Sequence, residues 1–390
     1  MKFIKYIIAT ILLYFYFHNP IFNMLGIGSI KLLYPLLLLY IFKDYRKGLF
    51  SFKNVFVCYV LLFGFSIFRF ILGGDVLYIY KSIIDCIETL FLPISLIILF
   101  KNNNIPFIKI LIYVGALSTL ITILCLVIPT FNLYVKQFLQ ETEFLKENTF
   151  RGFGISDNLV YAYGCILAII VGIYLRYNYT NKWFMFFIPL IGLSILVNAR
   201  IGFVIFFFAF FLYLFFNPKF ILKTLIGLGV LIILFISQTN FMFEDANTLV
   251  FIEQFFLEIK DILLGTNEAR GSTVDTLMGD MFVLPSYFEE WIMGTGKNIF
   301  LGEQNSDVGF LLQLNYGGIV YIVLLFLLIY NFFVKIKDRY ILYFFICATL
   351  IANIKGAFII NSGGSRVIFI TIIFLVINNY CENKDNKIIN

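Results

Sequence analysis

Three arginines of this chain stand beside or between long apolar runs, where a charged side chain is costly unless it has a task, and a fourth lies in a polar stretch. Arg151 precedes one apolar run, Arg200 lies between two, Arg366 begins the last, and Arg270 falls in a polar stretch. A planar guanidinium binds phosphate through two parallel hydrogen bonds. The four side chains therefore predict a site for the phosphate or pyrophosphate group of a lipid. Taken singly, each is explained equally well by snorkelling to the membrane interface.

Two acidic residues are candidate proton acceptors at the start of another apolar run. Asp307 opens the run that continues past Leu328, and Glu303 lies shortly before it. A carboxylate in this position can act as a general base toward an attacking hydroxyl. It also suits a helix cap, because Ser306 and Asp307 are preferred N-cap residues and a negative charge favours the positive end of the helix dipole. Capping and catalysis are compatible, and both stay open.

The elements that position these side chains must be membrane helices. Of the 390 residues, 61% are hydrophobic and only 13% are charged, whereas soluble domains carry about 25% charged residues. Inside a bilayer only helices and closed barrels satisfy every backbone polar group. Barrel strands alternate polar and apolar residues, but runs such as IGFVIFFFAFFLYLFF at 201–216 do not. The sequence therefore predicts an all-α integral membrane protein with a single polytopic domain over residues 1–390.

Apolar runs long enough to cross a hydrocarbon core of ~30 Å predict about twelve transmembrane helices. The seventh and eighth are separated only by Asn198-Ala199-Arg200, which requires a tight reversal at the membrane edge. The predicted spans are 3–19, 27–42, 55–72, 82–100, 106–129, 158–175, 183–199, 201–217, 220–237, 307–334, 341–354 and 366–380.

The distribution of basic residues predicts the orientation, because cytoplasmic loops retain lysine and arginine. With the N-terminus inside, most of the 29 lysines and arginines face the cytoplasm, and we expect both termini there. The net charge of +6 then reflects the basic residues of the cytoplasmic loops and does not indicate nucleic-acid binding. Segments 130–157 and 238–306 fall outside. The longer one, 238–306, is predicted to be an extracytoplasmic loop with short helices, since apolar residues recur at helical spacing over 247–264.

Motifs for nucleotide, metal and nucleophilic chemistry are absent from the sequence. It contains no GxxxxGK[ST], HExxH or GxSxG pattern, and its six cysteines form no CxxC pair. The single histidine, His18, has no neighbours that would complete a catalytic triad, so we expect a hydrogen-bonded imidazole at the membrane interface. The sequence therefore predicts neither a metal nor a cofactor.

Several short motifs occur in a characteristic order. They are RGFG at 151–154 followed by Asn158, NARIG at 198–202 between two apolar runs, Arg270 followed by WIMGTG at 291–296, and Ser306-Asp307 ahead of Gly317. In order and placement they resemble the O-antigen ligase and polymerase superfamily, over roughly residues 150 to 330 and in the plan of many helices with one long late outer loop.

The resemblance implies transfer of a glycan from an undecaprenyl diphosphate carrier at the outer face of the bacterial cytoplasmic membrane. Members of the ligase branch carry His-Asn, nine residues and then Gly, where this chain has Ser306-Asp307 and Gly317. The missing histidine favours the repeat-unit polymerases over the ligases, which stay an alternative. Such a polymerase joins oligosaccharide units into O-antigen or capsular polysaccharide. The carrier-linked oligosaccharide is then both donor and acceptor, and a chain-length regulator and a flippase are further expected partners.

The resemblance also gives the candidate residues their roles. Asp307 is the candidate general base and Glu303 the second choice, while arginines stabilise the leaving diphosphate without a metal ion. Aromatic side chains of the loop region either stack on sugars or anchor at the interface. The predicted substrate-binding residues are Arg151, Arg200, Arg270, Arg366, Asn158 and Trp291, with Tyr287 and Tyr316 as further aromatic candidates.

A flippase for lipid-linked oligosaccharides, or another secondary transporter, is the rival interpretation. Such a protein would place ionisable residues deep in the helix bundle and would have two similar halves. Arg69, Asp85 and Glu88 are the candidate deep charges, the last two about one helical turn apart. The sequence shows no internal repeat, and its long, asymmetric outer segment favours the transferase.

Overall fold

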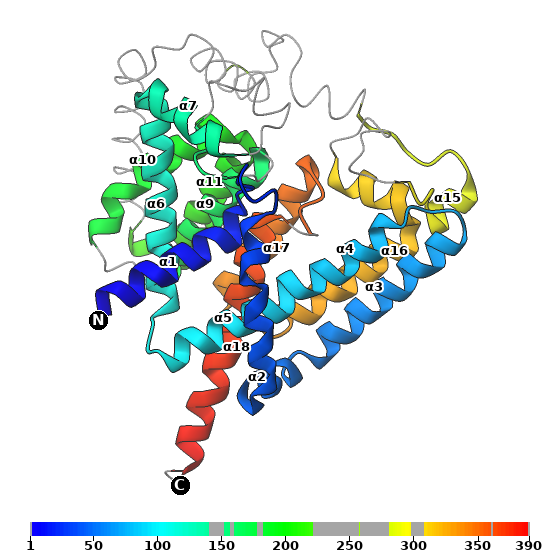
Figure 1. Cartoon of the computed structure of the whole chain (residues 1–390), viewed down its shortest axis with the longest axis horizontal. Helices are drawn as coiled ribbons and strands as arrows, with labels where there is room; N and C mark the ends of the chain where they lie inside the picture. The colour runs from blue at the N-terminus through cyan, green and yellow to red at the C-terminus, as the bar shows by residue number, and fades with distance from the viewer. Residues whose placement is uncertain are drawn as a thin grey trace. The chain divides into compact units, whose positions relative to one another are not determined.

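The computed structural model describes residues 2–139, 152–156, 160–177, 182–220, 257, 281–297, 308–359 and 362–388 (Figure 1). Across these residues the regular structure is helical, and β pairing occurs as the isolated bridges Ile21–Gly28 and Phe22–Leu139. The predicted all-α class is therefore confirmed. In the part of the chain that the structure describes, four helices are long and apolar enough to cross a membrane, over Lys53–Ile71, Leu77–Asn102, Phe107–Val127 and Gly309–Phe333. Their composition indicates a membrane protein, and the prediction of twelve spans stays a prediction.

Helices occupy the predicted apolar runs wherever the structure describes them. Nearly all of the predicted span 220–237 and of the predicted helix 247–264 lies outside the described residues. The helices are α1 (Lys2–His18), η1 (Ser29–Ile41), α2 (Lys43–Phe50), α3 (Lys53–Ile71), α4 (Leu77–Cys86), η2 (Ile87–Phe91), α5 (Leu92–Asn102), α6 (Phe107–Val127), α7 (Pro129–Phe138), α9 (Val160–Tyr177), α10 (Lys182–Asn198), α11 (Arg200–Phe216), η3 (Pro218–Phe220), α15 (Phe288–Met293), α16 (Gly309–Phe333), α17 (Arg339–Lys355) and α18 (Gly363–Ile388).

Two of the predicted spans have an unexpected helix type. The run predicted at 27–42 forms the 3₁₀ helix η1, which contains Pro35. Proline has no backbone N–H to donate and disfavours a regular α-helix around it. The run predicted at 82–100 is continuous through α4, η2 and α5, but η2 is a π-helical turn. Such turns are rare and occur frequently at functional sites.

The chain divides into two compact units, and each is described on its own. Unit 1 comprises Met1–Leu32, Ile108–Ser272 and Tyr343–Ala352, and unit 2 comprises Leu33–Phe107, Thr273–Leu342 and Asn353–Asn390. The single polytopic domain stays a prediction, as does the outer loop 238–306, of which the structure describes residue 257 and residues 281–297.

Unit 1 is centred on α9, which packs against α10 and α11. Where α9 and α11 meet, a Cβ atom on Gly202 would come within 2.8 Å of the backbone of Gly164. Small residues at such a contact allow two membrane helices to approach closely. α10 ends at Asn198 and α11 begins at Arg200. The predicted tight reversal is therefore confirmed, and Arg200 occupies the first turn of α11.

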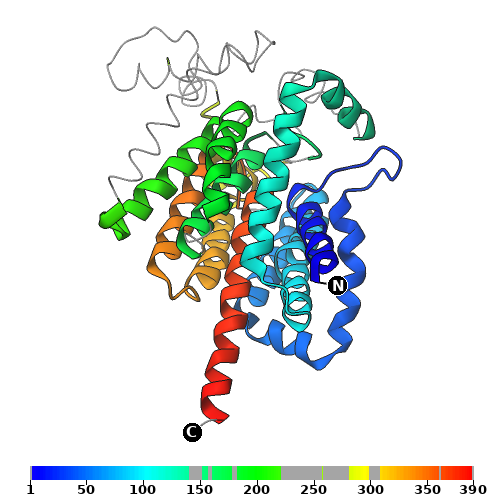
Figure 2. The ribbon, with the colours of Figure 1, turned by 90° about the vertical axis from the view of Figure 1, so that its left-hand side faces the viewer.

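Unit 2 contains α3, α4 and α16, and α3 packs against both α4 and α16 (Figure 1). The red helix α18 is continuous in both views (Figures 1 and 2) and packs against α5 and η2. α16 is interrupted at Gly318, whose backbone has φ 63° and ψ −165°. This positive φ is in a region that favours glycine, so Gly318 allows the helix to kink.

Candidate functional site

The predicted site residues are divided between the described and undescribed parts of the chain. Arg200 belongs to unit 1, and Trp291 and Arg366 belong to unit 2. The remaining predictions lie outside the described residues and concern Arg151, Asn158, Arg270, Glu303 and Asp307.

In unit 1, two of the arginine-bearing motifs lie side by side. The side-chain amide of Asn198 donates to the carbonyl of Gly152 at 3.3 Å and to that of Ser194 at 2.9 Å. Asn198 directly precedes the reversal that leads to Arg200, and Gly152 directly follows Arg151. The described part of the RGFG motif is thus joined to the NARIG motif, which is separated from it by 46 residues.

The segment after Gly152 is also fastened to α1. The Tyr14 hydroxyl donates to the carbonyl of Ile155 at 3.0 Å. His18 is fully buried, with Nδ1 3.3 Å from Ser156 Oγ and Nε2 2.8 Å from Ser118 Oγ. Because the Ser118 hydroxyl already donates to a backbone carbonyl, Nε2 is the donor of this pair. His18 is hydrogen-bonded as expected, but it is buried among helices.

In unit 2, the WIMGTG motif lies against the turn of α16 that precedes the kink. The backbone N–H groups of Thr295 and Gly296 donate to the carbonyls of Asn315 and Tyr316 at 2.6 Å and 2.9 Å. A break in a helix releases carbonyls from its own hydrogen-bond ladder, and inside a membrane these need other donors. The kink at Gly318 therefore creates the acceptors that the motif uses.

Glycine is required at the start of this GTG segment. Gly294 has a φ of 72°, and a Cβ atom there would collide with the Tyr316 carbonyl and with Gly317. Its own carbonyl accepts a hydrogen bond at 3.0 Å from Nη2 of the buried Arg69 in α3. The WIMGTG motif and Gly317, both singled out in the sequence, are thus packed together. Arg69 holds the motif through its hydrogen bond to Gly294, a role that the sequence did not indicate.

The predicted aromatic residues differ in exposure. Trp291 is partly buried against the apolar cluster of Val308, Leu311 and Leu314. Tyr287 is 71% exposed. Tyr316, in contrast, has a fully buried ring stacked on Tyr78. A buried, stacked ring does not offer a face to a sugar, so Trp291 and Tyr287 keep that candidate role and Tyr316 does not.

Arg366 lies in the first turn of α18. The Ser362 hydroxyl accepts a hydrogen bond from the backbone N–H of Ser365 at 3.1 Å, which caps the helix start. A cation near a helix N-terminus is disfavoured by the helix dipole. The Arg366 side chain is nevertheless only 3% exposed, and its Nη2 lies 3.0 Å from Glu88 Oε2. The carboxylate of Glu88 therefore offsets both the burial and the dipole.

Glu88 is held in place from a further element of unit 2. The Tyr34 hydroxyl of η1 donates to Glu88 Oε1 at 3.1 Å, so each carboxylate oxygen has a partner. Glu88 and Arg366 are 278 residues apart in the sequence. The sequence therefore predicted the arginine as a ligand for phosphate and the glutamate as an isolated charge deep in the bundle. The structure makes them one ion pair.

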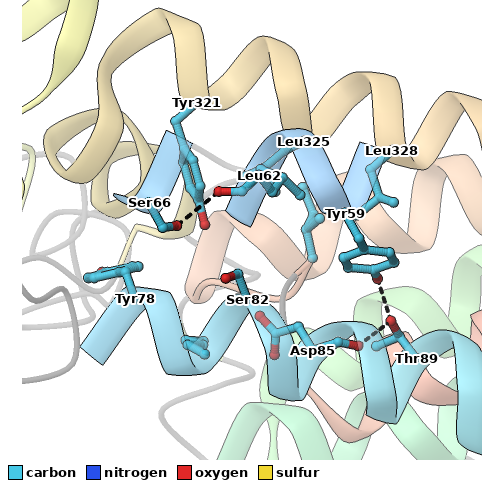
Figure 3. A pocket seen from close by; sticks show the side chains of 12 residues that line it. Tyr59, Leu62, Ser66, Tyr78, Ser82, Asp85, Thr89, Tyr321, Leu325 and Leu328 are labelled. Atoms are coloured by element: carbon cyan, nitrogen blue, oxygen red, sulfur yellow. Dashed lines mark hydrogen bonds between the residues drawn. The ribbon is translucent and has the colours of Figure 1, made fainter. Parts of the chain in front are cut away.

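A small cavity lies among α3, α4 and α16 (Figure 3). Two of its lining residues, Asp85 and Thr89, lie on either side of Glu88 in the sequence. Its volume is about 20 Å³, and its polar lining includes Tyr59, Ser66, Lys81, Ser82, Asp85 and Thr89. A space of this size holds one water molecule, and neither a sugar nor a diphosphate fits in it. The cavity is therefore too small to be the predicted glycan-binding site.

No known protein indicates what the site does. Comparisons with protein-family models, with curated proteins and with solved structures find no match to this chain. The resemblance to the O-antigen ligase and polymerase superfamily therefore rests on its short sequence motifs alone. Among the described residues no three His, Cys, Asp or Glu side chains gather in a way that would hold a metal ion.

Proposed function

We propose that this protein is a membrane glycosyltransferase that polymerises undecaprenyl-diphosphate-linked oligosaccharide repeat units into O-antigen or capsular polysaccharide. The reaction takes place at the outer face of the bacterial cytoplasmic membrane. The hydrogen bond from Asn198 to the Gly152 carbonyl carries the proposal. It connects two motifs that each contain an arginine, Arg151 and Arg200, as a shared diphosphate site requires.

The proposed reaction is a displacement at the anomeric carbon of the donor sugar. A hydroxyl of the acceptor repeat unit attacks this carbon, and the electron pair of the broken carbon–oxygen bond stays with the leaving undecaprenyl diphosphate. Guanidinium groups stabilise the negative charge that develops there. The hydroxyl proton passes to a general base, for which Asp307 is the first candidate and Glu303 the second.

The second motif pair brings together described residues that flank the candidate bases in the sequence. Trp291 packs against Val308 at the start of α16, and Gly296 is hydrogen-bonded to Tyr316 of the same helix. The residues on either side of segment 298–307, which carries Glu303 and Asp307, thus contact the same end of α16.

The test is made in a polysaccharide-producing bacterium whose own gene is replaced by variants of this one. Arg200→Ala and Arg270→Ala are expected to abolish long-chain polysaccharide while single repeat units still reach the cell surface. Lys31→Ala is the matched control, because Lys31 is an exposed cation on the predicted outer side. All three proteins must be present in the membrane at the normal level. A normal chain-length ladder in both arginine variants would remove the diphosphate role.

A lipid-linked oligosaccharide flippase or another secondary transporter is the second candidate function. The buried pair of Glu88 and Arg366 favours it, because ionisable residues inside a membrane protein often mark transport pathways. The two functions differ in what a gene deletion leaves behind. Single repeat units at the surface indicate a polymerase, whereas lipid-linked units retained inside the cell indicate a flippase.

A further inference from the structure

Asp85 of α4 has a buried carboxylate oxygen without a hydrogen-bond partner. The residue is 6% exposed, and within the described part of the chain its Oδ1 is buried and meets no donor. The side chain lines the cavity of about 20 Å³ described above (Figure 3). An isolated carboxylate in such surroundings is strongly disfavoured unless it is paired or neutralised.

Four of the hydroxyl groups around this cavity do not meet that need. Ser66, Ser82 and Thr89 each donate their hydroxyl hydrogen to a backbone carbonyl of their own helix, at distances of 2.6 to 3.0 Å. The Tyr59 hydroxyl is hydrogen-bonded to Thr89 Oγ1. Because these hydrogens are already committed, the oxygens that remain toward the cavity are acceptors. A lining that contains such acceptors and a carboxylate suits a ligand that donates hydrogen bonds or a proton.

Charged groups near Asp85 come from more than one element. Glu88 and Arg366 neutralise each other through their ion pair. Asp85 is then balanced either by the ammonium group of Lys81, one turn earlier in α4, or by a proton of its own. The titratable groups around it are Lys81 of α4, Glu88 of η2, Arg366 of α18, Tyr34 of η1, Tyr59 of α3, Tyr78 of α4 and Tyr321 of α16.

We propose that Asp85 is a proton-binding site inside the helix bundle of unit 2. The carboxylate takes up one proton, delivered through the water-sized cavity, and becomes a neutral carboxylic acid; on release the proton returns by the same route. The cavity has room for about one water molecule, which excludes larger ligands. Lys81 lines the same space, and an ammonium group there disfavours a metal cation. The π-helical turn Ile87–Phe91, a type of turn frequent at functional sites, begins two residues after Asp85.

Infrared difference spectroscopy on the purified, detergent-solubilised protein tests this proposal directly. Spectra are recorded in H₂O and in D₂O across the neutral pH range. We expect the C=O band of a protonated carboxyl group, shifted in D₂O, to be lost on raising the pH and to be missing from Asp85→Asn. Asp44→Asn is the matched control, because Asp44 is exposed on α2, and it should keep the band.

Two further variants distinguish a proton site from a structural carboxylate. Asp85→Glu retains a carboxyl group, so its band should reappear at an altered frequency even if Asp85→Asn does not fold. Lys81→Met should move the pH at which the band disappears, because it removes the neighbouring ammonium. Spectra of Asp85→Glu and Lys81→Met that match the wild type would overturn the proposal. Sodium-dependent thermal stabilisation that is lost in Asp85→Glu, with no titrating band in the wild type, would overturn it as well. Neither measurement depends on glycan transfer.

Discussion

Arg366 Nη2 and Glu88 Oε2 lie 3.0 Å apart, and each side chain is only 3% exposed. The two residues are 278 positions apart in the sequence, and both belong to unit 2. A pair of this kind gains little stability over apolar residues, but removing one member leaves a charge buried alone. The pair therefore fixes how η2 and the first turn of α18 meet.

Replacing Glu88 with Gln should destabilise the protein by about 3 kcal/mol, because the buried Arg366 guanidinium loses its counter-charge. The double variant Glu88→Gln with Arg366→Met should regain a large part of this loss. Chemical denaturation in mixed micelles measures both. Asp44→Asn is the control, since its 3.8 Å pair with Lys47 is exposed and should contribute less than about 0.5 kcal/mol. Equal effects of Glu88→Gln and Asp44→Asn would contradict the buried ion pair.

Gly294→Ala should displace the WIMGTG motif from α16, because the new Cβ atom collides with the backbone at Tyr316 and Gly317. We expect a loss of about 2 kcal/mol or more and, with it, loss of long-chain polysaccharide. Gly26→Ala provides the comparison, since Gly26 has a φ of 61° but no atom within 4 Å of its Cβ position. It reports backbone strain alone, about 1 kcal/mol. A Gly294 variant as stable as the Gly26 variant would show that the close contact does not exist in the protein.

His18→Ala should loosen the segment that follows Arg151, because Ser156 and Ser118 lose their shared imidazole. Leaving buried polar groups unsatisfied costs about 2 kcal/mol. The expected result is a lower thermal midpoint in detergent and faster proteolysis within 152–156. His18→Gln, which can still hydrogen-bond, should recover part of the stability. If His18→Ala is as stable as the wild type, His18 does not anchor the segment 152–156. Lys31→Ala controls for substitution in the exposed part of unit 1.

Asn353→Leu should destabilise unit 2 although it keeps the side-chain size. Asn353 Oδ1 accepts from the backbone N–H groups of Phe358 and Ile359 at 3.0 Å and 3.4 Å, and its amide pairs with Gln313 at 3.3 Å. Without this acceptor oxygen and the amide donor we expect a loss of about 2 to 3 kcal/mol. Denaturation of the Asn353→Leu and Asn353→Asp variants distinguishes the cause. Asn353→Asp keeps the acceptor oxygen, so it should lose less, and the reverse order would refute this explanation.

Much of the helical plan is already present in the sequence. Unbroken apolar runs predict helices in a membrane because no other open structure satisfies the backbone there, and helices do fill the predicted runs that the structure describes. The reversal at Ala199 was equally predictable, because the predicted spans 183–199 and 201–217 follow each other almost directly. The 3₁₀ form of η1, the π-helical turn η2 and the kink at Gly318 were not predicted, since hydrophobic length does not report the hydrogen-bond pattern inside a run.

The pairing of the site residues depended on tertiary structure. The sequence marked Arg366 as a cation placed where burial is costly, and it marked Glu88 as a deep acid, but only the packing of α18 against η2 showed that they neutralise each other. The sequence also marked WIMGTG and Gly317 as motifs. Their contact depends on the kink of α16 at Gly318, which frees backbone carbonyls to accept hydrogen bonds from the WIMGTG segment. Composition and residue type thus determined that this is an all-helical membrane protein rich in arginine motifs. The chain's fold decided which charges are partners, because Coulomb energy depends on distance in space and not on separation along the chain.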